Sequence, residues 1–451
     1  MITKSHLARL GLFDTRVPRY TSYPTAPQFG AQVGASQFAD WTGHIPEDSQ
    51  ISLYLHVPFC RRLCWFCACR TQGTQTLGPI AAYVQTLKQE LALLGQVLPK
   101  GVTLSRLHWG GGTPTLLEAG MIRDLAQAVF DVTPLAPGAE FSVEIDPNEL
   151  GPARMAALAE AGMNRASIGV QDFDPAIQKV IGREQSYEVT RRAVDMIRGH
   201  GIEGLNADIL FGLPHQSPAK ITESVMKLLS LNPSRVALYG YAHVPWVARR
   251  QTMIPSDALP TPEARLELFE TARQLFLWDG YDEIGIDHFA LPSDGLAVAQ
   301  KAGRLRRNFQ GYTDDASDVL IGLGASSISR FPQGFAQNAP ATSAYVAAVR
   351  DGRFSTARGH AFSGDDALRA RLIEALMCDF RIDTGEILAR FAVSRATLDQ
   401  MFRQVNDSVD GLLRHDETGL EIPEALRPLT RIVAKGFDAY GMDRSRHSAA
   451  I

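Results

Sequence analysis

Near its start the chain reads Tyr54-Leu-His-Val-Pro-Phe-Cys60-Arg-Arg-Leu-Cys64-Trp-Phe-Cys67-Ala-Cys69, and this stretch holds four of its five cysteines. The apolar run before it, Ile51–Val57, predicts a buried strand that ends before Pro58. The cysteines follow at once, spaced C-x3-C-x2-C-x-C, in the loop after that strand. Cysteines clustered this densely are typical of a site for a soft metal.

Three kinds of cysteine site compete for this loop. A structural zinc site needs four ligands closed into a tetrahedron, usually from two well-separated C-x2-C pairs, and the chain has no second pair. Disulfides are disfavoured because a cytosolic chain keeps its thiols reduced. An iron–sulfur cluster held by three thiolates, with one iron left open, needs a compact loop, which C-x3-C-x2-C supplies. We favour the iron–sulfur cluster and keep zinc as the alternative.

The composition excludes several classes of protein. The chain has 451 residues, 45% of them hydrophobic and 21% charged, which is ordinary for a globular protein of two or three domains. The net charge of −4 gives no general attraction to nucleic acid or to anionic membranes. No apolar stretch is long enough to span a bilayer, and the charged start has no apolar secretory signal. We therefore expect a cytoplasmic protein that binds no nucleic acid.

Strand and helix patterns alternate from residue 51 onward. Helical stripes separate six short apolar runs, which are Ile51–Val57, Leu104–Trp109, Phe141–Ile145, Ala166–Val170, Leu205–Leu210 and Val236–Tyr241. Such alternation predicts parallel strands with right-handed crossovers. Six units do not close an eight-fold barrel, so the predicted α/β fold is an incomplete (β/α)6 TIM-like barrel with an open side.

Four segments are expected along the chain. Residues 1–50 contain several prolines and aromatic residues and predict an N-terminal arm wrapped on a later surface. Residues 51–290 form the partial barrel. Residues 291–360 break the alternation and predict a lid or substrate segment. Residues 361–451 regain apolar periodicity and predict a mostly helical C-terminal domain.

Motifs along most of the chain resemble one known family. The C-x3-C-x2-C loop, with Phe66 before its last cysteine, is similar to the radical S-adenosylmethionine (SAM) superfamily. Six motifs agree in order and spacing with the oxygen-independent coproporphyrinogen III oxidase (dehydrogenase) family: Arg19-Tyr-Thr-Ser-Tyr-Pro-Thr25, Cys67-Ala-Cys69, His108-Trp-Gly-Gly-Gly-Thr-Pro-Thr115, Ile181-Gly-Arg-Glu-Gln-Ser186, Asp287-His-Phe-Ala-Leu-Pro292 and Asn308-Phe-Gln-Gly-Tyr-Thr313.

The resemblance implies a reaction and its cofactors. The reaction is oxidative decarboxylation of two propionates of coproporphyrinogen III to the vinyls of protoporphyrinogen IX, in anaerobic haem biosynthesis. One 4Fe–4S cluster would be held by Cys60, Cys64 and Cys67, and SAM would chelate the fourth iron. Cys69 is left out of the ligand set. A reduced donor such as flavodoxin or ferredoxin would supply electrons to a monomeric, cytoplasmic enzyme.

Several polar residues lie at or near the predicted strand ends, where barrel enzymes carry their chemistry. Three glycines after Trp109 permit close approach of the backbone to a ligand, although a plain turn is the alternative. Glu144 and Asp208 interrupt apolar strands, where a carboxylate is costly unless it meets a cation or hydrogen-bond donors. Arg183 offers a fixed charge to a carboxylate, with a surface ion pair as the alternative.

The family resemblance also implies two SAM molecules side by side. The first would contact Tyr54, Gly111, Glu144 and Ile328. The second would contact Phe66, Gly112, Thr113, Gln171, Arg183, Asp208 and Ala242. Tyr54, Ala242 and Ile328 are assigned by the resemblance alone. We assign catalytic roles to Tyr54, Glu144 and Gln310.

The remaining candidates have weaker signals. His56, His108 and His288 lie beside motifs, but packed and hydrogen-bonded histidines are the expected reading. The basic run Lys301–Arg307 is either a solvated face or a site for the propionates of the substrate. A haem-binding chaperone on the same fold is the alternative function. Such a chaperone would be expected to lack the Cys67-x-Cys69 extension and the aromatic arm motif, which are both present.

Overall fold

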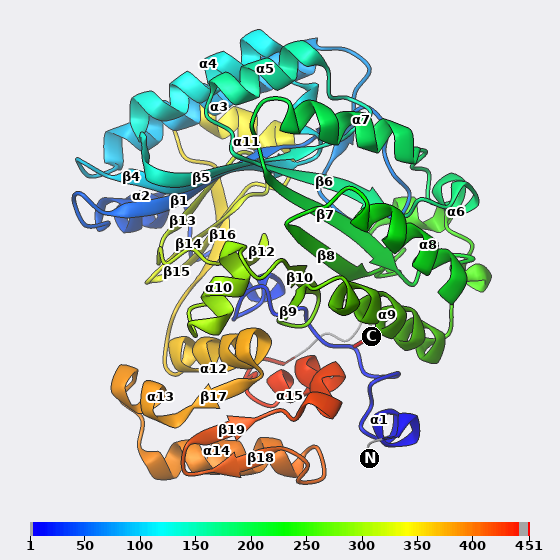
Figure 1. Ribbon diagram of the computed structural model, residues 1–451. Helices are drawn as coiled ribbons and strands as arrows, with labels where there is room; N and C mark the ends of the chain where they lie inside the picture. The colour runs from blue at the N-terminus through cyan, green and yellow to red at the C-terminus, as the bar shows by residue number, and fades with distance from the viewer. Residues whose placement is uncertain (1–2, 442–449) are drawn as a thin grey trace.

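A curved sheet of twelve strands dominates the computed structural model, which describes residues 3–441 and 450–451. Six consecutive parallel strands form its centre (Figure 1): β1 (Gln50–Val57), β4 (Thr103–Gly111), β5 (Leu135–Ile145), β6 (Arg165–Gln171), β7 (Gly204–Phe211) and β8 (Arg235–Gly240). These are the six predicted runs, each extended or shifted by a few residues. The predicted open-sided α/β barrel is confirmed.

Helices cover the convex outer face of this sheet (Figure 1), namely α3 (Gly78–Val97), α4 (Ala119–Val132), α5 (Pro152–Glu160), α6 (Pro175–Val180), α7 (Tyr187–Arg198), α8 (Pro218–Leu229) and α9 (Pro262–Trp278). Helix α3 buries the stripe that runs from Ile80 to Leu94 against the strands. Helix α9 begins at Thr261, whose hydroxyl accepts a hydrogen bond from the Ala264 amide. The apolar periodicity therefore predicts both the helices and their buried faces.

The sheet continues beyond the six central strands at both edges. Next to β1 lie β13 (Leu320–Leu323), β14 (Ile328–Phe331), β15 (Gly334–Asn338) and β16 (Thr356–Ala361), and next to β8 lie β10 (His288–Ala290) and β9 (Asp282–Ile284). Helix α11 (Thr342–Arg350) joins β15 to β16. Residues 320–360 therefore extend the sheet and do not form a loop or lid. These short strands carry glycine and serine, which hide the apolar alternation. The segment boundaries themselves stay a prediction.

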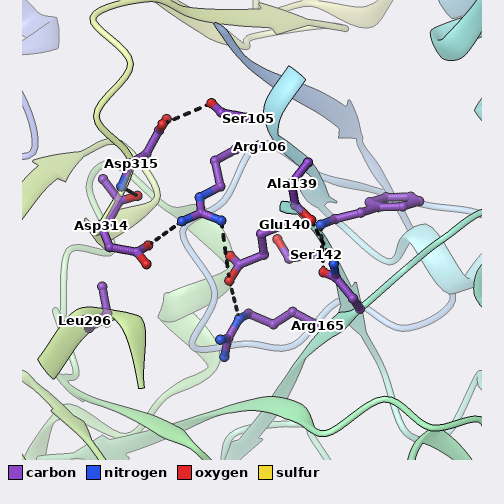
Figure 2. Close-up of polar contacts among 12 residues, drawn as sticks. Ser105, Arg106, Ala139, Glu140, Ser142, Arg165, Leu296, Asp314 and Asp315 are labelled. Carbon is purple, nitrogen blue, oxygen red and sulfur yellow. Dashed lines mark hydrogen bonds and ion pairs between the residues drawn. The ribbon is translucent and has the colours of Figure 1, made fainter. Parts of the chain in front are cut away.

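Helix α10 (Gly295–Lys301) and a hairpin of β11 (Arg306–Asn308) and β12 (Gly311–Thr313) lie on the inner side of the barrel (Figure 1). The residues after the hairpin are tied to the strands by polar contacts (Figure 2). Asp314 lies 2.8 Å from Arg106 on β4, and Asp315 accepts a hydrogen bond from Ser105 at 3.1 Å. The same network holds Glu140, which Arg165 contacts at 2.6 Å. Ion pairs thus fix the hairpin relative to the barrel strands.

Replacing Asp294 with alanine is expected to destabilise this end of the barrel. Its carboxylate receives hydrogen bonds from Arg235 and Arg165, and only 2% of its side chain is exposed. Removing it leaves buried positive charge with less compensation, which costs about 3 kcal/mol in the free energy of unfolding. Urea titration followed by circular dichroism measures the loss. The control Asp351→Ala breaks an exposed ion pair with Arg353 and should stay within about 0.5 kcal/mol of the wild type; equal losses would contradict the prediction.

A second core joins the two ends of the chain. Helices α12 (Asp366–Asp379), α13 (Thr384–Arg390), α14 (Arg395–Asp407) and α15 (Thr430–Lys435) surround a small sheet of β17 (Arg381–Asp383), β19 (Gly419–Glu421) and β18 (Arg414–Asp416). Leu7, Leu12 and Val17 of the N-terminal arm are buried in this core. The arm also contains α1 (Lys4–Arg9) and α2 (Ala35–Gly43), which the irregular sequence did not predict.

None of the helices among residues 3–441 is both long and apolar enough to cross a membrane.

Candidate active site

The cysteine loop lies at the C-terminal end of β1. Strand β2 (Phe59–Cys60) pairs with β3 (Gln72–Gly73), which brings the two ends of the loop together. Within the loop the Cys67 amide donates a hydrogen bond to the Cys64 carbonyl at 3.3 Å. Cys60, Cys64 and Cys67 are partly exposed, and Cys69 is exposed. None of the four cysteines is joined in a disulfide.

The thiols of the loop differ in acidity. Burial raises the pKa of Cys60 to about 11, whereas a hydrogen bond from Cys69 lowers the pKa of Cys67 to about 6. Arg250 and Arg183 lower the Cys67 pKa further. The Arg183 guanidinium also lies 3.6 Å from the Cys64 sulfur. Positive charge beside these sulfurs favours thiolates, the form that binds metal.

The described His, Cys, Asp and Glu side chains include no group of three or more placed to hold one metal ion. A 4Fe–4S cluster has a different requirement, because each cysteine binds a different iron and the sulfurs need not converge on one point. The compact loop with three thiols and an adjacent arginine therefore fits such a cluster.

The glycine turn after β4 packs directly against the cysteine loop. A side chain at Gly112 would place its Cβ 2.4 Å from the Phe59 carbonyl oxygen, and Gly111 has a φ of +110°. The amides of this turn are already used. Gly111 donates to Glu144 at 2.9 Å, Gly112 to Val57 at 2.8 Å and Thr113 to Phe59 at 2.7 Å. These three amides are therefore not free to bind a ligand, and close packing requires glycine at Gly111 and Gly112.

Glu144 connects the glycine turn to two aromatic side chains. Its carboxylate accepts the Gly111 hydrogen bond and lies 3.4 Å from Nε2 of His108. The ring of His108 stacks on Tyr54 at a centroid distance of 5.6 Å. The surrounding protein would raise the pKa of Glu144, but His108 and the Gly111 amide outweigh this and lower it. Glu144 is therefore an anion whose side chain is 41% exposed to the cavity.

Glu144 shares a cavity of about 250 Å³ inside the barrel with Asp208 and Gln310. Gln310 lies at the exposed tip of the β11–β12 hairpin, and its amide donates to Asn308 at 2.8 Å. Burial and the neighbouring Glu144 raise the pKa of Asp208 to about 7, although Arg183 acts in the opposite direction. Three residues from distant parts of the sequence thus meet in one polar cavity.

Arg183 is only partly exposed, and it forms no surface ion pair with any of the described residues. Its guanidinium donates to the Gly169 carbonyl at 2.9 Å and to Gln185 at 3.1 Å, in addition to its contact with Cys64. Gln171 ends β6 beside this group and has a φ of +69°, a left-handed conformation that is uncommon for a residue other than glycine. Both side chains are positioned between the cysteine loop and the end of β6.

The three positions assigned by resemblance alone, Tyr54, Ile328 and Ala242, lie in two different parts of the site. Ile328 begins β14, and its carbonyl packs on Gly322, which pairs with Tyr54 in the sheet. Ala242 follows β8 and is tied to Phe66 by Gln251, whose amide donates to Phe66 at 2.7 Å and to Ala242 at 3.0 Å. Gln251 was missed by the sequence analysis, since it lies in an irregular segment without a pattern. Gln251 therefore connects the cysteine loop to the segment that follows β8.

The histidines are packed and hydrogen-bonded, as expected. His56 contacts the Tyr54 hydroxyl at 2.9 Å, His108 contacts Ser142, and His288 contacts Asp287 at 2.6 Å. The basic run Lys301–Arg307 does not form one patch. Lys301 pairs with Asp282 and Arg306 with Glu374, whereas Arg307 is buried next to Asp287.

Known proteins show the same architecture. Residues 54–228 match the family model of the Radical SAM superfamily. The chain is 66% identical over 451 residues to the oxygen-independent coproporphyrinogen III oxidase of Paracoccus denitrificans, and the match covers 100% of both chains. The chain belongs to the oxygen-independent coproporphyrinogen III oxidase family.

The family relationship extends to distant bacteria and to a solved structure. The oxygen-independent coproporphyrinogen III oxidase of Escherichia coli K12 is 35% identical over 442 residues, which cover 98% of this chain and 96% of that one. The solved structure of coproporphyrinogen III oxidase (HemN) from Escherichia coli, described as a radical SAM enzyme, superimposes with a TM-score of 0.89 over 94% of this chain and 98% of that chain.

Proposed function

We propose that this protein oxidatively decarboxylates two propionates of coproporphyrinogen III to the vinyls of protoporphyrinogen IX in anaerobic haem biosynthesis. The observation that carries the proposal is full-length identity of 66% to a coproporphyrinogen III oxidase. The site agrees with it, since the glycine turn packs on the cysteine loop and Glu144, which accepts a hydrogen bond from Gly111, also lines the polar cavity.

The cysteine loop is the proposed cofactor site. Cys60, Cys64 and Cys67 would hold a 4Fe–4S cluster, and Arg183 beside Cys64 would stabilise its thiolates. When bound, the cluster and SAM supply a 5′-deoxyadenosyl radical that removes a hydrogen atom from an unactivated C–H bond. The Cys69 amide nitrogen lies 3.4 Å from the Cys67 sulfur. We propose that Cys69 is a neighbour of the cluster and not one of its ligands.

Two SAM molecules are proposed to lie on the two sides of the glycine turn. Glu144 and Tyr54 would orient the first, together with Gly111 and Ile328. Asp208, Arg183 and Gln171 would orient the second, together with Phe66, Gly112, Thr113 and Ala242. Because the turn amides are satisfied internally, side chains and backbone carbonyls must make the contacts. Gln310 is proposed to face the substrate from the hairpin tip.

The remaining proposals concern partners. A reduced flavodoxin or ferredoxin is proposed to supply electrons through the exposed side of the cysteine loop, where Cys69 is exposed. We further propose a monomeric enzyme of the cytoplasm.

Anaerobic turnover tests the function. The reconstituted enzyme is incubated with coproporphyrinogen III, SAM and a reductant, and products are separated by chromatography. About two 5′-deoxyadenosines per protoporphyrinogen are expected, one for each propionate. Cleavage of SAM without a vinyl product would overturn the substrate assignment. Tight stoichiometric binding of haem without turnover would favour a haem chaperone instead.

The affinity for SAM is expected to fall as pH decreases through 7. Burial raises the pKa of Asp208 to about 7, and only its ionised form attracts a cationic ligand. The kcat/KM for SAM should therefore rise about tenfold between pH 6 and pH 8, because that profile reports groups of the free enzyme. Asp208→Asn should flatten the rise, and the exposed control Asp195→Asn should retain it. A rise that persists in Asp208→Asn would assign the titration to another group.

A further inference from the structure

A second and larger cavity lies beside the barrel site. Its volume is about 920 Å³, at the upper end of ordinary small-molecule sites. Helices α9, α1 and α15 contribute residues to its lining. Its inner wall is the segment Gly240–Ala242 at the carboxyl end of β8. The cavity thus adjoins Ala242, a proposed SAM contact, and has room for a ligand larger than SAM.

Eight arginines line this cavity, and four of them, Arg19, Arg265, Arg307 and Arg431, come from distant parts of the chain. Asp287 lies 3.7 Å from Arg307 and also attracts Arg19. Among the described residues, no Asp or Glu side chain lies within ion-pair distance of Arg19 or Arg265. The positive charge of this wall therefore exceeds the negative charge that faces it.

Backbone carbonyls accept hydrogen bonds from these guanidinium groups. Arg19 donates to Gly240 at 2.7 Å, Arg265 to Ile451 at 3.2 Å and Arg431 to Pro18 at 3.0 Å. The Gly240 carbonyl has no net charge, so it positions the Arg19 guanidinium without neutralising it. Burial, with Arg19 as a neighbouring cation, lowers the pKa of Arg265 to about 10 and that of Arg431 to about 9. An anion in the cavity would relieve this repulsion.

Arg307 shows unused hydrogen-bonding capacity. It is 7% exposed, and its Nε and Nη1 atoms have no hydrogen-bond partner among the described residues. It lies on β11, and the same hairpin carries Gln310 into the barrel cavity. The charges of Arg307 and Arg19 also act on Tyr239, which lines the barrel cavity with Asp208. The basic wall is therefore adjacent to the site proposed for the reaction.

We propose that this cavity binds propionate carboxylates of the tetrapyrrole substrate, with Arg19 and Arg265 as the principal anion-binding residues and Arg431 beside them. The inference rests on the proposed function and names the part of the site that recognises the substrate. Coproporphyrinogen III carries four propionates and only two react. A wall of arginines holds the others and selects for tetrapyrroles with many carboxylates, because each lost carboxylate leaves a buried guanidinium without its anion.

Fluorescence titration with coproporphyrin III, the oxidised ring with the same four propionates, tests this site directly. Arg265→Met and Arg19→Met keep the length of the side chain and remove its charge, and each should raise the Kd about tenfold or more. Arg265→Lys keeps the charge and should lose less. The control Arg123→Met breaks an exposed pair with Glu160 on the outer helices and should bind like the wild type. Circular dichroism verifies folding.

Two further measurements separate the possible outcomes. Raising salt should weaken wild-type binding more than binding by Arg265→Met, because fewer charges remain to be screened. Mesoporphyrin IX, with two propionates, should lose less affinity in the variants than coproporphyrin III. An active wild type whose methionine variants bind coproporphyrin III within twofold of it would overturn this site and leave the proposed function intact. A wild type that neither binds the porphyrin nor turns over coproporphyrinogen would overturn both.

Discussion

Replacing Cys64 with serine is expected to remove the iron and all activity. A serine hydroxyl is a harder, far less acidic group than a thiol and does not replace a thiolate on iron. The substitution also removes the sulfur that Arg183 contacts at 3.6 Å. The wild type, reconstituted anaerobically, should contain about four irons and four sulfides per chain, with the broad visible absorption of a 4Fe–4S cluster. Cys60→Ser and Cys67→Ser should behave in the same way.

Cys69 and Cys378 provide the matched controls. Cys69 lies two residues from Cys67 and is exposed, and Cys378 is fully buried on helix α12. Serine at Cys69 should retain about four irons with altered activity, because the cluster ligands remain. Iron retained in Cys64→Ser and lost in Cys69→Ser would show that the ligand set is a different one. Iron absent and zinc present in the wild type would reject the cluster altogether.

Glu144→Gln is expected to lower the rate of 5′-deoxyadenosine formation about 100-fold with the iron content unchanged. The amide has the same shape as the carboxylate but no charge for the SAM ammonium group. It also weakens the contacts with the Gly111 amide and with His108, which are 2.9 and 3.4 Å long. The measurement is 5′-deoxyadenosine released with dithionite as reductant, together with the KM for SAM.

Glu160→Gln is the control, because Glu160 is an exposed partner of Arg123 far from the cavity. It should leave both the rate and the KM within twofold of the wild type. A Glu144→Gln enzyme that cleaves SAM at nearly the wild-type rate would remove Glu144 from the site. A Glu144→Gln enzyme that cleaves SAM normally but forms no vinyl product would indicate that Glu144 acts on the substrate and not on SAM.

Local patterns predicted most of the barrel. Alternating apolar runs identified all six central strands, and the stripe from Ile80 to Leu94 identified α3. Glu144 and Asp208 were found for a physical reason, since a carboxylate within an apolar strand requires a partner. In the structure both line one cavity. Signals of this kind lie within a few residues, which is why the sequence reveals them.

Long-range features were not predictable in the same way. Strands β14 to β16 depend on pairing with one another and only through β13 with β1, so their glycine- and serine-containing sequences show little alternation. Gln251 acts by joining Phe66 to Ala242, which are far apart along the chain. The arginine wall combines residues from the arm, α9, β11 and α15, none of which carries a motif for it. Tertiary structure alone brings these groups together.

The shared core of the two chain ends has a consequence for synthesis. Leu12 and Val17 share a core with Leu372 and Phe437. The core partners of the arm are therefore translated hundreds of residues after the arm itself. At ~5–20 residues per second, roughly 20–80 s pass before those partners leave the ribosome. During that interval the arm exposes apolar surface to solvent, and the nascent barrel lacks one wall of the large cavity. Contacts of such sequence separation slow folding, so the completed chain is the first species in which both cores can close.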